Sequence, residues 1–553
     1  MSEYKTISDS LHEIANWLST QNPVLEKLIH ELAQSFATPD KNDQLLKEYQ
    51  RLVDEHHKRL ESTSHPSQDT WFSLHQNLLA LLKTQATEII DSNSETLTSK
   101  EVDFLNKQIS TFLESENFFL GNREAVREAI ESNGQSLSRG LAYLSNELGV
   151  CQTHLSPPGA LVLGKDIACT PGKIIFQNHL FELIQYRAST KSVKQHPILI
   201  VPPFINKYYV LDLRPENSLV RFLVDQGMTV FMISWKNPMS PRDGEMTWND
   251  YIHDGVDQAI RTCLDVYAGR RLNIAGYCVG GTLTSTAISA LDKVTRRKIA
   301  SLTLFNTLID YTDAGELSCY VNERFVAYLE QIIGEQGIFP GHLMTAAFSS
   351  LKPRELIWNH VQRTYLLGNT PPVFDLLHWN GDMTNVAGPA LCYYLRNMYL
   401  ENKLVPTTRS SKTKPLINFD EIDCPKFIVA SVNDHIVPWN GALESAKLFG
   451  SPCKFVLSDG GHVAGIVNPV DCTKITGFST TDANLAEINS SNFFERGTRQ
   501  TGSWWPTWFS WLAEHSGKNV RSRQSTGKPG SQFISHAPGQ YVQEKCRVAP
   551  FVL

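Results

Sequence analysis

The chain carries no excess of positive charge that would suit it to nucleic acid. Its 51 lysines and arginines are outnumbered by 57 aspartates and glutamates, so the formal net charge is −6 at pH 7. Binding to a phosphate backbone depends on a basic field that attracts the anion. We therefore expect no nucleic-acid partner.

Metal-type and membrane-type patterns are also missing. The ten cysteines are scattered, and no two of them form a CxxC pair or another metal-ligand spacing, which argues against a zinc site and a disulfide framework. No stretch reaches the roughly 18 consecutive apolar residues of a membrane helix or holds the apolar core of a signal peptide. We expect no metal, no transmembrane segment, and a cytoplasmic protein with reduced thiols.

The composition is that of a large folded protein. Hydrophobic residues make up 41% of the chain and charged residues 20%, which is the balance of a protein that buries a core. A length of 553 residues exceeds one ordinary hydrophobic core. We therefore expect two domains.

The first 160 residues have the spacing of helices. Apolar residues recur at helical intervals at Leu11, Ile14 and Leu18, then at Val126 and Ile130, and then at Leu137, Leu141 and Leu144. No strand-like run interrupts this part of the chain. We predict a mainly helical N-terminal domain at 1–160.

After Gly159 short apolar runs alternate with helical patterns. The runs lie at 197–202, 229–235, 272–276, 301–305, 426–431 and 454–457, with amphipathic stretches such as 248–267 and 439–448 between them. Alternating strands and helices are typical of a mostly parallel sheet. We predict an α/β catalytic domain at 161–553.

A long segment separates the fourth apolar run from the fifth. Residues 310–420 are rich in Trp, Tyr, Phe and Leu, and a simple connection between parallel strands is far shorter. We interpret this segment as an inserted cap over the carboxyl edge of the sheet, where ligands bind in open α/β folds. Near the C-terminus, Trp504, Trp505, Trp508 and Trp511 are expected to anchor against the core.

The segment 272–282 has the pattern of a nucleophile elbow. A strand runs into Gly276-Tyr-Cys278-Val-Gly280, and a helical pattern follows. The glycines allow strand and helix to approach closely at a strained turn, and the helix N-terminus favours a thiolate at Cys278. A cysteine after a buried strand is more often core filling, but the strand-turn-helix context favours a nucleophile.

An acid and a histidine follow in the order that a hydrolase-type triad requires. Asp434 comes after the run at 426–431, and His462 comes after the run at 454–457. Asp434 can orient the His462 ring, and His462 can deprotonate Cys278. His435 and Asp459 are second-ranked rivals for the base and the acid, and His435 is also a candidate for the substrate channel.

Two main-chain groups are candidates for an oxyanion hole. The N–H of Val279 directly follows the nucleophile, and the turn after the first strand offers a second N–H near Phe204. The side chain of Phe204 can at the same time be a core aromatic.

These residues carry a resemblance to the polyhydroxyalkanoate synthases, and the class I type is the one that the chain resembles. The matching segments include 202–213, 234–238, 276–282, 379–385, 434–439, 461–469 and 502–506. Phe204 stands where some relatives carry a smaller residue. The resemblance implies an α/β-hydrolase fold with Cys278 as acyl-accepting nucleophile, His462 as base, and Asp434 helping to activate the 3-hydroxyl group.

The resemblance also implies a reaction and partners. The substrate would be a 3-hydroxyacyl-coenzyme A with a short acyl group such as 3-hydroxybutyryl, and coenzyme A would be its carrier and a product rather than a cofactor. The implied partners are a growing polyester chain, the surface of cytoplasmic polyester granules and a second copy of the chain. The implied homodimer is more active when the cap opens. An esterase or depolymerase on the same fold and a non-catalytic granule scaffold are the rival functions. A cysteine at position 278, where most such hydrolases use serine, argues against the hydrolase. The intact set of Cys278, Asp434 and His462 argues against the scaffold.

No residue is assigned to the coenzyme A phosphates. Lys207, Arg214 and Arg396 are basic residues near matching motifs. A solvated or structurally paired charge is the favoured interpretation of each.

Overall fold

The computed structural model describes residues 75–546 apart from 77–78, 81, 85, 89, 92–96, 151–152, 336, 406–415, 451, 473–476, 482–483, 524, 529 and 531. Within these ranges, no helix has both the length and the apolar character needed to cross a membrane. The predicted helix with Leu11, Ile14 and Leu18 lies outside the described residues.

The chain divides into two compact units. The helical unit contains Met1–Thr153 together with Ala346–Pro372, and the sheet unit contains His154–Thr345 and Val373–Leu553. Part of the predicted cap at 310–420 therefore groups with the N-terminal residues and part with the sheet. The boundary between domains at 160 and 161 stays a prediction.

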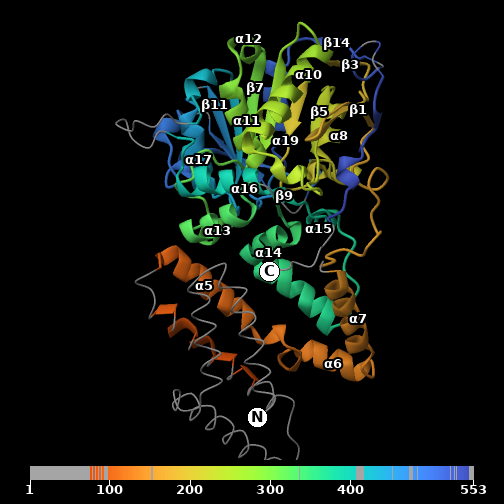
Figure 1. Cartoon of the computed structure of the whole chain (residues 1–553), viewed down its shortest axis with the longest axis vertical. Helices are drawn as coiled ribbons and strands as arrows, with labels where there is room; N and C mark the ends of the chain where they lie inside the picture. Colours follow the sequence, from red (N-terminus) through yellow and green to blue (C-terminus); the bar gives the residue numbers. More distant parts are fainter. Residues whose placement is uncertain are drawn as a thin grey trace, which may run out of the picture. The chain divides into compact units, whose positions relative to one another are not determined.

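The sheet unit is built on an 11-stranded sheet with the order β13-β12-β11-β10-β7-β6-β4-β5-β2-β1-β15. Its six central strands are parallel: β5 (Val230–Trp235), β4 (Ile198–Val201), β6 (Leu272–Tyr277), β7 (Ile299–Phe305), β10 (Lys426–Ser431) and β11 (Cys453–Ser458). These are the six strands that the sequence predicts, and they place their carboxyl ends at one edge. Figure 1 shows the sheet extending from β11 on one side to β1 on the other.

Five outer strands are antiparallel to their neighbours. They are β1 (Gly172–Gln177), β2 (Phe181–Tyr186), β12 (Gly477–Thr481), β13 (Thr498–Thr501) and β15 (Ser535–His536). None of these five strands is among the apolar runs that predict the central strands. β12 and β13 are rich in threonine and polar residues, so they lack the apolar runs by which the central strands were found.

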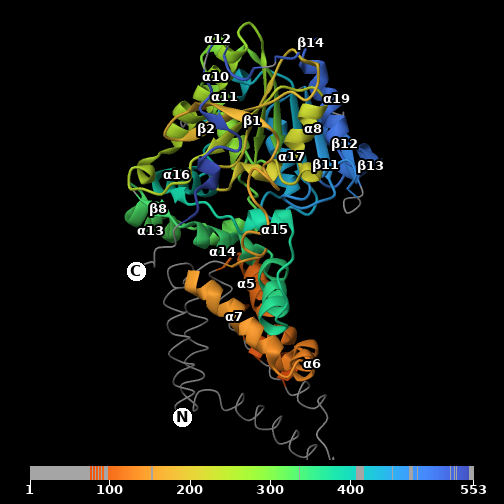
Figure 2. The same ribbon diagram turned by 90° about the vertical axis from the view of Figure 1, so that its right-hand side faces the viewer.

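Helices cover both faces of the sheet. In Figure 2, α10 (Gln258–Val266) and α11 (Val279–Ala290) lie on one side of the strands, and α8 (Leu219–Asp225) and α19 (Trp505–His515) lie on the other. α17 (Trp439–Leu448) has the bounds that the sequence predicts. The predicted helix at 248–267 is present as α9 (Trp248–Asp250), the π-helical segment η8 (Tyr251–Asp257) and α10.

The C-terminal tryptophans anchor α19 to the sheet. Trp504, Trp505 and Trp508 are fully buried in the core cluster, as the sequence predicts. The indole N–H of Trp508 donates to Thr303 Oγ1 on β7 at 3.0 Å, and its ring packs edge-on against Phe305. Large aromatic area and a satisfied indole N–H together stabilise this contact.

The inserted segment is helical in both units. The sheet unit contains α13 (Glu323–Ile333), α15 (Asp375–Asn380), α16 (Gly388–Tyr394) and η12 (Leu395–Leu400), and α16 packs against α13 and α9. α14 (Gly341–Leu351) contains the boundary between the units, and η10 (Arg354–Trp358) and η11 (Val361–Leu366) belong to the helical unit.

Two helices of the helical unit bury small and polar residues. The helices of this unit include α5 (Ser99–Phe112), α6 (Arg123–Glu131) and α7 (Gln135–Val150), coloured orange and brown in Figure 1. The apolar side chains of Ile130 and Leu141 are 61% and 64% exposed. The residues of α6 and α7 that the structure describes as buried are Ala125, Ala129, Ser136, Gly140 and Glu147.

Close backbone packing explains this choice of face. A Cβ at Gly140 would lie 1.8 Å from the carbonyl oxygen of Tyr365 in η11. Glu147 accepts a hydrogen bond from the Tyr365 hydroxyl at 2.5 Å and lies 3.2 Å from His360 Nε2. Because the partner segment comes from far along the chain, helical spacing alone does not show which face is buried.

We predict that Trp508→Ala lowers the free energy of unfolding of the sheet unit by about 3–5 kcal/mol, because it removes a buried indole and leaves a cavity. Denaturant unfolding measures the change. Trp511→Ala on the same helix is the matched control, because Trp511 is only half-buried, and it should cost clearly less. Equal losses at the two positions would contradict the assigned core.

Candidate active site

Cys278 lies on a strained turn between β6 and α11. Its φ is 53° and its ψ is −130°, which is a rare conformation for a residue with a side chain. A Cβ at Gly276 would lie 2.5 Å from Gly281 Cα, and a Cβ at Gly280 would lie 2.4 Å from the carbonyl oxygen of Val201. The strand, the turn and the helix therefore meet as closely as the glycine pattern predicts.

Asp434 and His462 meet at the carboxyl edge of the sheet. Asp434 follows β10 and His462 follows β11, and His462 Nδ1 lies 2.7 Å from Asp434 Oδ2. Asp434 Oδ1 accepts the N–H groups of Ile436 and Val437 at 2.9 and 2.8 Å. The carboxylate is thus held by its own turn and presents one oxygen to the imidazole.

The loop and ring of His462 are fixed from a second direction. Its carbonyl oxygen accepts hydrogen bonds from Asn306 Nδ2 at 2.6 Å and from the Tyr277 hydroxyl at 3.1 Å. The Tyr277 ring stacks on the imidazole with 5.5 Å between centroids. Tyr277 belongs to the same turn as Cys278, so nucleophile and histidine are placed by one set of contacts.

The environment favours a charged His462. Burial alone lowers the pKa of His462, but the Asp434 carboxylate and the neighbouring Cys278 sulfur outweigh burial and raise it to about 10. In general, an imidazolium beside a cysteine stabilises the thiolate form of that cysteine. The arrangement therefore places a charged imidazolium, which is a proton donor at neutral pH, beside the Cys278 sulfur.

The rival residues have other surroundings. Asp459 forms an ion pair with Arg499 of β13, through both of its carboxylate oxygens. His435 is half-buried beside Asp434. Asp434 has its two oxygens engaged by His462 and by its own turn, so the geometry favours His462 over His435 as its partner.

The two oxyanion candidates lie on backbone segments that touch. Val279 is the first residue of α11, where main-chain N–H groups lack helical partners. Phe204 lies in the turn after β4, and this turn is held by the Trp235 indole N–H, which donates to the Pro202 carbonyl at 2.8 Å. Gly280 packs against Val201 and Pro202, which brings α11 and the Phe204 turn together.

The side chain of Phe204 belongs to an aromatic group. It is 1% exposed and stacks on Tyr251 with 4.5 Å between centroids. Trp248 lies edge-on to Phe204 and stacks on Tyr394 of α16. The expected core role of the side chain is confirmed, and the main-chain role stays a prediction.

Three tyrosines near the nucleophile were missed in the sequence. Tyr311 and Tyr394 are buried and Tyr399 is half-buried. Burial raises the pKa of each, with a further contribution from Cys278. Tyr311 Oη lies 2.9 Å from Tyr394 Oη and 3.2 Å from Thr282 Oγ1 on α11. The aromatic content of the inserted segment was the available signal, and by itself it indicated only packing.

Two of the three basic candidates are structurally paired, as favoured above. Lys207 is buried and forms an ion pair with Asp382 at 2.9 Å. Arg396 binds Glu330 and Glu323. Arg214 is half-buried at the start of η6 (Pro215–Asn217). Among the described residues, no group of three or more His, Cys, Asp or Glu side chains could hold a metal ion.

The fold and the site together define an enzyme of the α/β-hydrolase fold with a cysteine at the nucleophile position. The family model for the alpha/beta hydrolase fold matches residues 196–469, and the model for the N-terminus of poly-beta-hydroxybutyrate polymerase (PhaC) matches residues 56–223. The chain belongs to the poly(3-hydroxyalkanoate) polymerase family, whose members are acyltransferases.

The relatives match over most of their length. The poly(3-hydroxyalkanoate) polymerase subunit PhaC of Cupriavidus necator is 39% identical over 84% of this chain and 80% of its own. The subunit of the same name from Rhizobium etli is 38% identical over 81% and 70%. Among solved structures, the monoacylglycerol lipase of Paleococcus ferrophilus covers 60% of this chain and 99% of its own at 13% identity, with a TM-score of 0.33.

We predict that Asp434→Asn slows alkylation of Cys278 by iodoacetamide at pH 7 by about tenfold or more. Without the carboxylate, burial lowers the His462 pKa, so the imidazolium that stabilises the thiolate is lost at neutral pH. The difference should shrink above about pH 9, where a thiol ionises without help. Mass spectrometry of the Cys278 peptide between pH 6 and 10 measures the rate.

Asp459→Asn is the matched control for this prediction. It removes a carboxylate in the loop just before His462 and breaks the ion pair with Arg499. It leaves the contact between Asp434 and His462 in place, so the alkylation rate should stay within about twofold of wild type. A slow rate in Asp459→Asn with a normal rate in Asp434→Asn would reverse the assignment of the acid.

Proposed function

We propose that this polymerase extends a polyester by transferring 3-hydroxyacyl groups from coenzyme A thioesters through a covalent thioester on Cys278. The observation that carries the proposal is the placement of Cys278 on a strained turn whose preceding residue, Tyr277, stacks on His462, while Asp434 holds the His462 ring through Nδ1. The family membership supports a polyester as the product, and the geometry of the site supports thioester exchange on Cys278.

Acylation begins with attack of the Cys278 thiolate on the thioester carbonyl. The carbonyl oxygen becomes an oxyanion that the N–H groups of Val279 and Phe204 would stabilise. When the carbonyl re-forms, the bond to the coenzyme A sulfur breaks, and His462 gives that sulfur its proton. A thioester is exchanged for a thioester, so the step is close to neutral in free energy, whereas a serine ester would be a sink.

Chain transfer uses the now neutral His462 as a base. It takes the proton from a 3-hydroxyl group while the hydroxyl oxygen attacks the acyl carbon on Cys278, and the thiolate leaves with the imidazolium restored beside it. Each cycle forms one ester bond and releases one coenzyme A.

The contacts of Asp434 support a role through His462. Its side chain is 0% exposed, and its two oxygens are engaged by His462 and by its own turn. Direct activation of the 3-hydroxyl by Asp434, which the family resemblance implies, would require the hydroxyl to reach a carboxylate that is shielded from solvent in this structure. Orientation of the imidazole and stabilisation of its charge require no such access.

Several finer assignments rest on the family resemblance. A short monomer such as 3-hydroxybutyryl-coenzyme A follows from the likeness to the class I type. Association with cytoplasmic granules follows from the insolubility of the product. A homodimer follows from the family's use of the inserted segment, and the two relatives described above carry the word subunit in their names. His435, half-buried next to Asp434, is proposed to line the substrate channel.

We predict that purified protein releases coenzyme A from 3-hydroxybutyryl-coenzyme A and forms insoluble polyester. Cys278→Ser should lower both by a factor on the order of 10³ or more, because it removes the thiolate on which both steps depend. Free thiol is followed by a colorimetric reagent, and the product is identified by methanolysis.

Two other outcomes would replace the proposal. Release of coenzyme A with only free 3-hydroxybutyrate would define a thioesterase. No release from short or medium acyl chains, with Cys278 still open to alkylation, would favour a scaffold that has kept the fold.

A further inference from the structure

A buried lysine lies just beyond the turn that carries Phe204. The Lys207 side chain is 4% exposed, and its ammonium group donates to three oxygens: Asp382 Oδ1 at 2.9 Å, the Val542 carbonyl at 2.8 Å and the Glu544 carbonyl at 2.8 Å. All three ammonium protons are therefore used. The partners come from the inserted segment and from the C-terminal segment.

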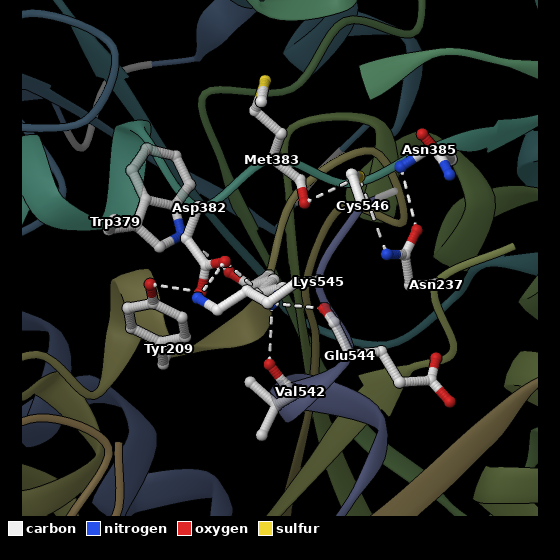
Figure 3. Close-up of polar contacts among 11 residues, drawn as sticks. Tyr209, Asn237, Trp379, Asp382, Met383, Asn385, Val542, Glu544, Lys545 and Cys546 are labelled. Atoms are coloured by element: carbon white, nitrogen blue, oxygen red, sulfur yellow. Dashed lines mark hydrogen bonds and ion pairs between the residues drawn. The ribbon is translucent and has the colours of Figure 1, made fainter. Parts of the chain in front are cut away.

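Asp382, in the inserted segment, contacts residues both from the segment around Lys207 and from the C-terminal segment. Its carboxylate also accepts hydrogen bonds from the Tyr209 hydroxyl at 2.9 Å and from Lys545 Nζ at 2.7 Å. Nearby, the Trp379 indole N–H donates to the Lys207 carbonyl at 2.8 Å. Figure 3 shows these side chains converging on the Asp382 carboxylate from separate segments.

The C-terminal segment is held along its length. Glu182 of β2 accepts the N–H groups of Gln540 and Tyr541 at 2.9 and 3.1 Å. Cys546 Sγ lies 3.2 Å from the Met383 carbonyl, next to Asn237, which accepts the N–H of Asn385 at 2.9 Å (Figure 3). The segment thus forms one wall around Lys207 and Asp382.

The charges in this cluster depend on each other. Burial lowers the pKa of Lys207, although Asp382 opposes this effect. Burial raises the pKa of Asp382, but Lys207 and Lys545 outweigh it and hold the pKa below its ordinary value. A buried ion that loses its partner strongly destabilises the fold. The ion pair of Lys207 and Asp382 therefore fixes the relative positions of the two segments that carry these residues.

The fixed position of Lys207 affects the site because Phe204 precedes Lys207 in the same turn. Phe204 is three residues earlier in the same turn, and Trp235 and Gly280 hold only the beginning of that turn, at Val201 and Pro202. Lys207 and Tyr209 hold its end. An N–H group must lie within a few tenths of an ångström of its place to stabilise an oxyanion.

We propose that Lys207 and Asp382 are positioning residues that fix the Phe204 N–H for acyl transfer to Cys278, with the C-terminal segment as the third support. This inference rests on the proposed function for the acylation of Cys278 and for the oxyanion role of the Phe204 N–H, but not for the identity of the natural substrate. It gives the last residues of the described chain a role in setting the rate of acyl transfer rather than only in stability.

We predict that Lys207→Met lowers kcat and kcat/KM equally, by about 10- to 100-fold, with KM unchanged, because the N–H stabilises only the transition state. The readout is the burst of p-nitrophenol from p-nitrophenyl butyrate, which reports acylation of Cys278 without coenzyme A. Alkylation of Cys278 by iodoacetamide should stay within about twofold of wild type, because that reaction forms no oxyanion.

Lys426→Met is the matched control. Lys426 is equally buried and its ammonium donates to the Phe449 carbonyl at 2.9 Å, but it lies at the start of β10, at the opposite edge of the sheet. This variant loses a buried charge and its hydrogen bond, and both acylation and alkylation per folded molecule should remain at wild-type rates.

Two more variants separate position from stability. Lys545→Met removes an exposed cation and keeps the buried pair, so the burst should slow by only about two- to fivefold. Lys207→Met with Asp382→Leu leaves no unpaired buried charge, so this double variant should fold even where the single variant does not. Its acylation should still be slow.

The outcomes distinguish this inference from the proposed function. A wild-type acylation rate in the folded double variant, or a parallel loss of acylation and alkylation in Lys207→Met, would overturn the positioning role. A normal burst in wild type that slows in Lys207→Met, together with no coenzyme A release from 3-hydroxybutyryl-coenzyme A, would support the positioning role and reject the proposed substrate.

Discussion

The close approach of strand β6, helix α11 and the turn after β4 is the constraint on which the rest of the site depends. Neither Gly276 nor Gly280 has room for a Cβ, and Cys278 is held at a positive φ between them. This packing places Cys278 at the carboxyl end of β6 and brings α11 against the turn that contains Phe204. A larger residue at either glycine would move the nucleophile and the oxyanion turn together.

The charges proposed for catalysis depend on the positions that this packing sets. A buried imidazole favours its neutral form, so the charged form of His462 needs both the Asp434 carboxylate and the neighbouring sulfur. Tyr277 connects the two halves of this arrangement, because it precedes Cys278 and stacks on His462. The proposed chemistry of a thioester polymerase fits this balance, since the full cycle begins and ends with a thiolate beside an imidazolium.

Segments remote in sequence complete the edge of the sheet. The inserted helices bring Tyr394 and Asp382 to the sheet unit, and the C-terminal segment adds Lys545 and two carbonyl groups. Of these contacts, the pair of Lys207 and Asp382 joins residues 175 positions apart, and Lys207 reaches Val542 across 335 positions. The site is therefore local at the nucleophile and highly non-local around it.

Local patterns were enough to predict the six central strands and the elbow at Cys278, because apolar runs and glycine spacing can be recognised within a short segment. The chain order of Cys278, Asp434 and His462 could be predicted because parallel strands end at one edge of the sheet. The buried face of α7, the tyrosines near Cys278 and the contacts of Lys207 became known only from the three-dimensional structure. Those features depend on close packing and charge pairing between distant segments, and no local period encodes such partners.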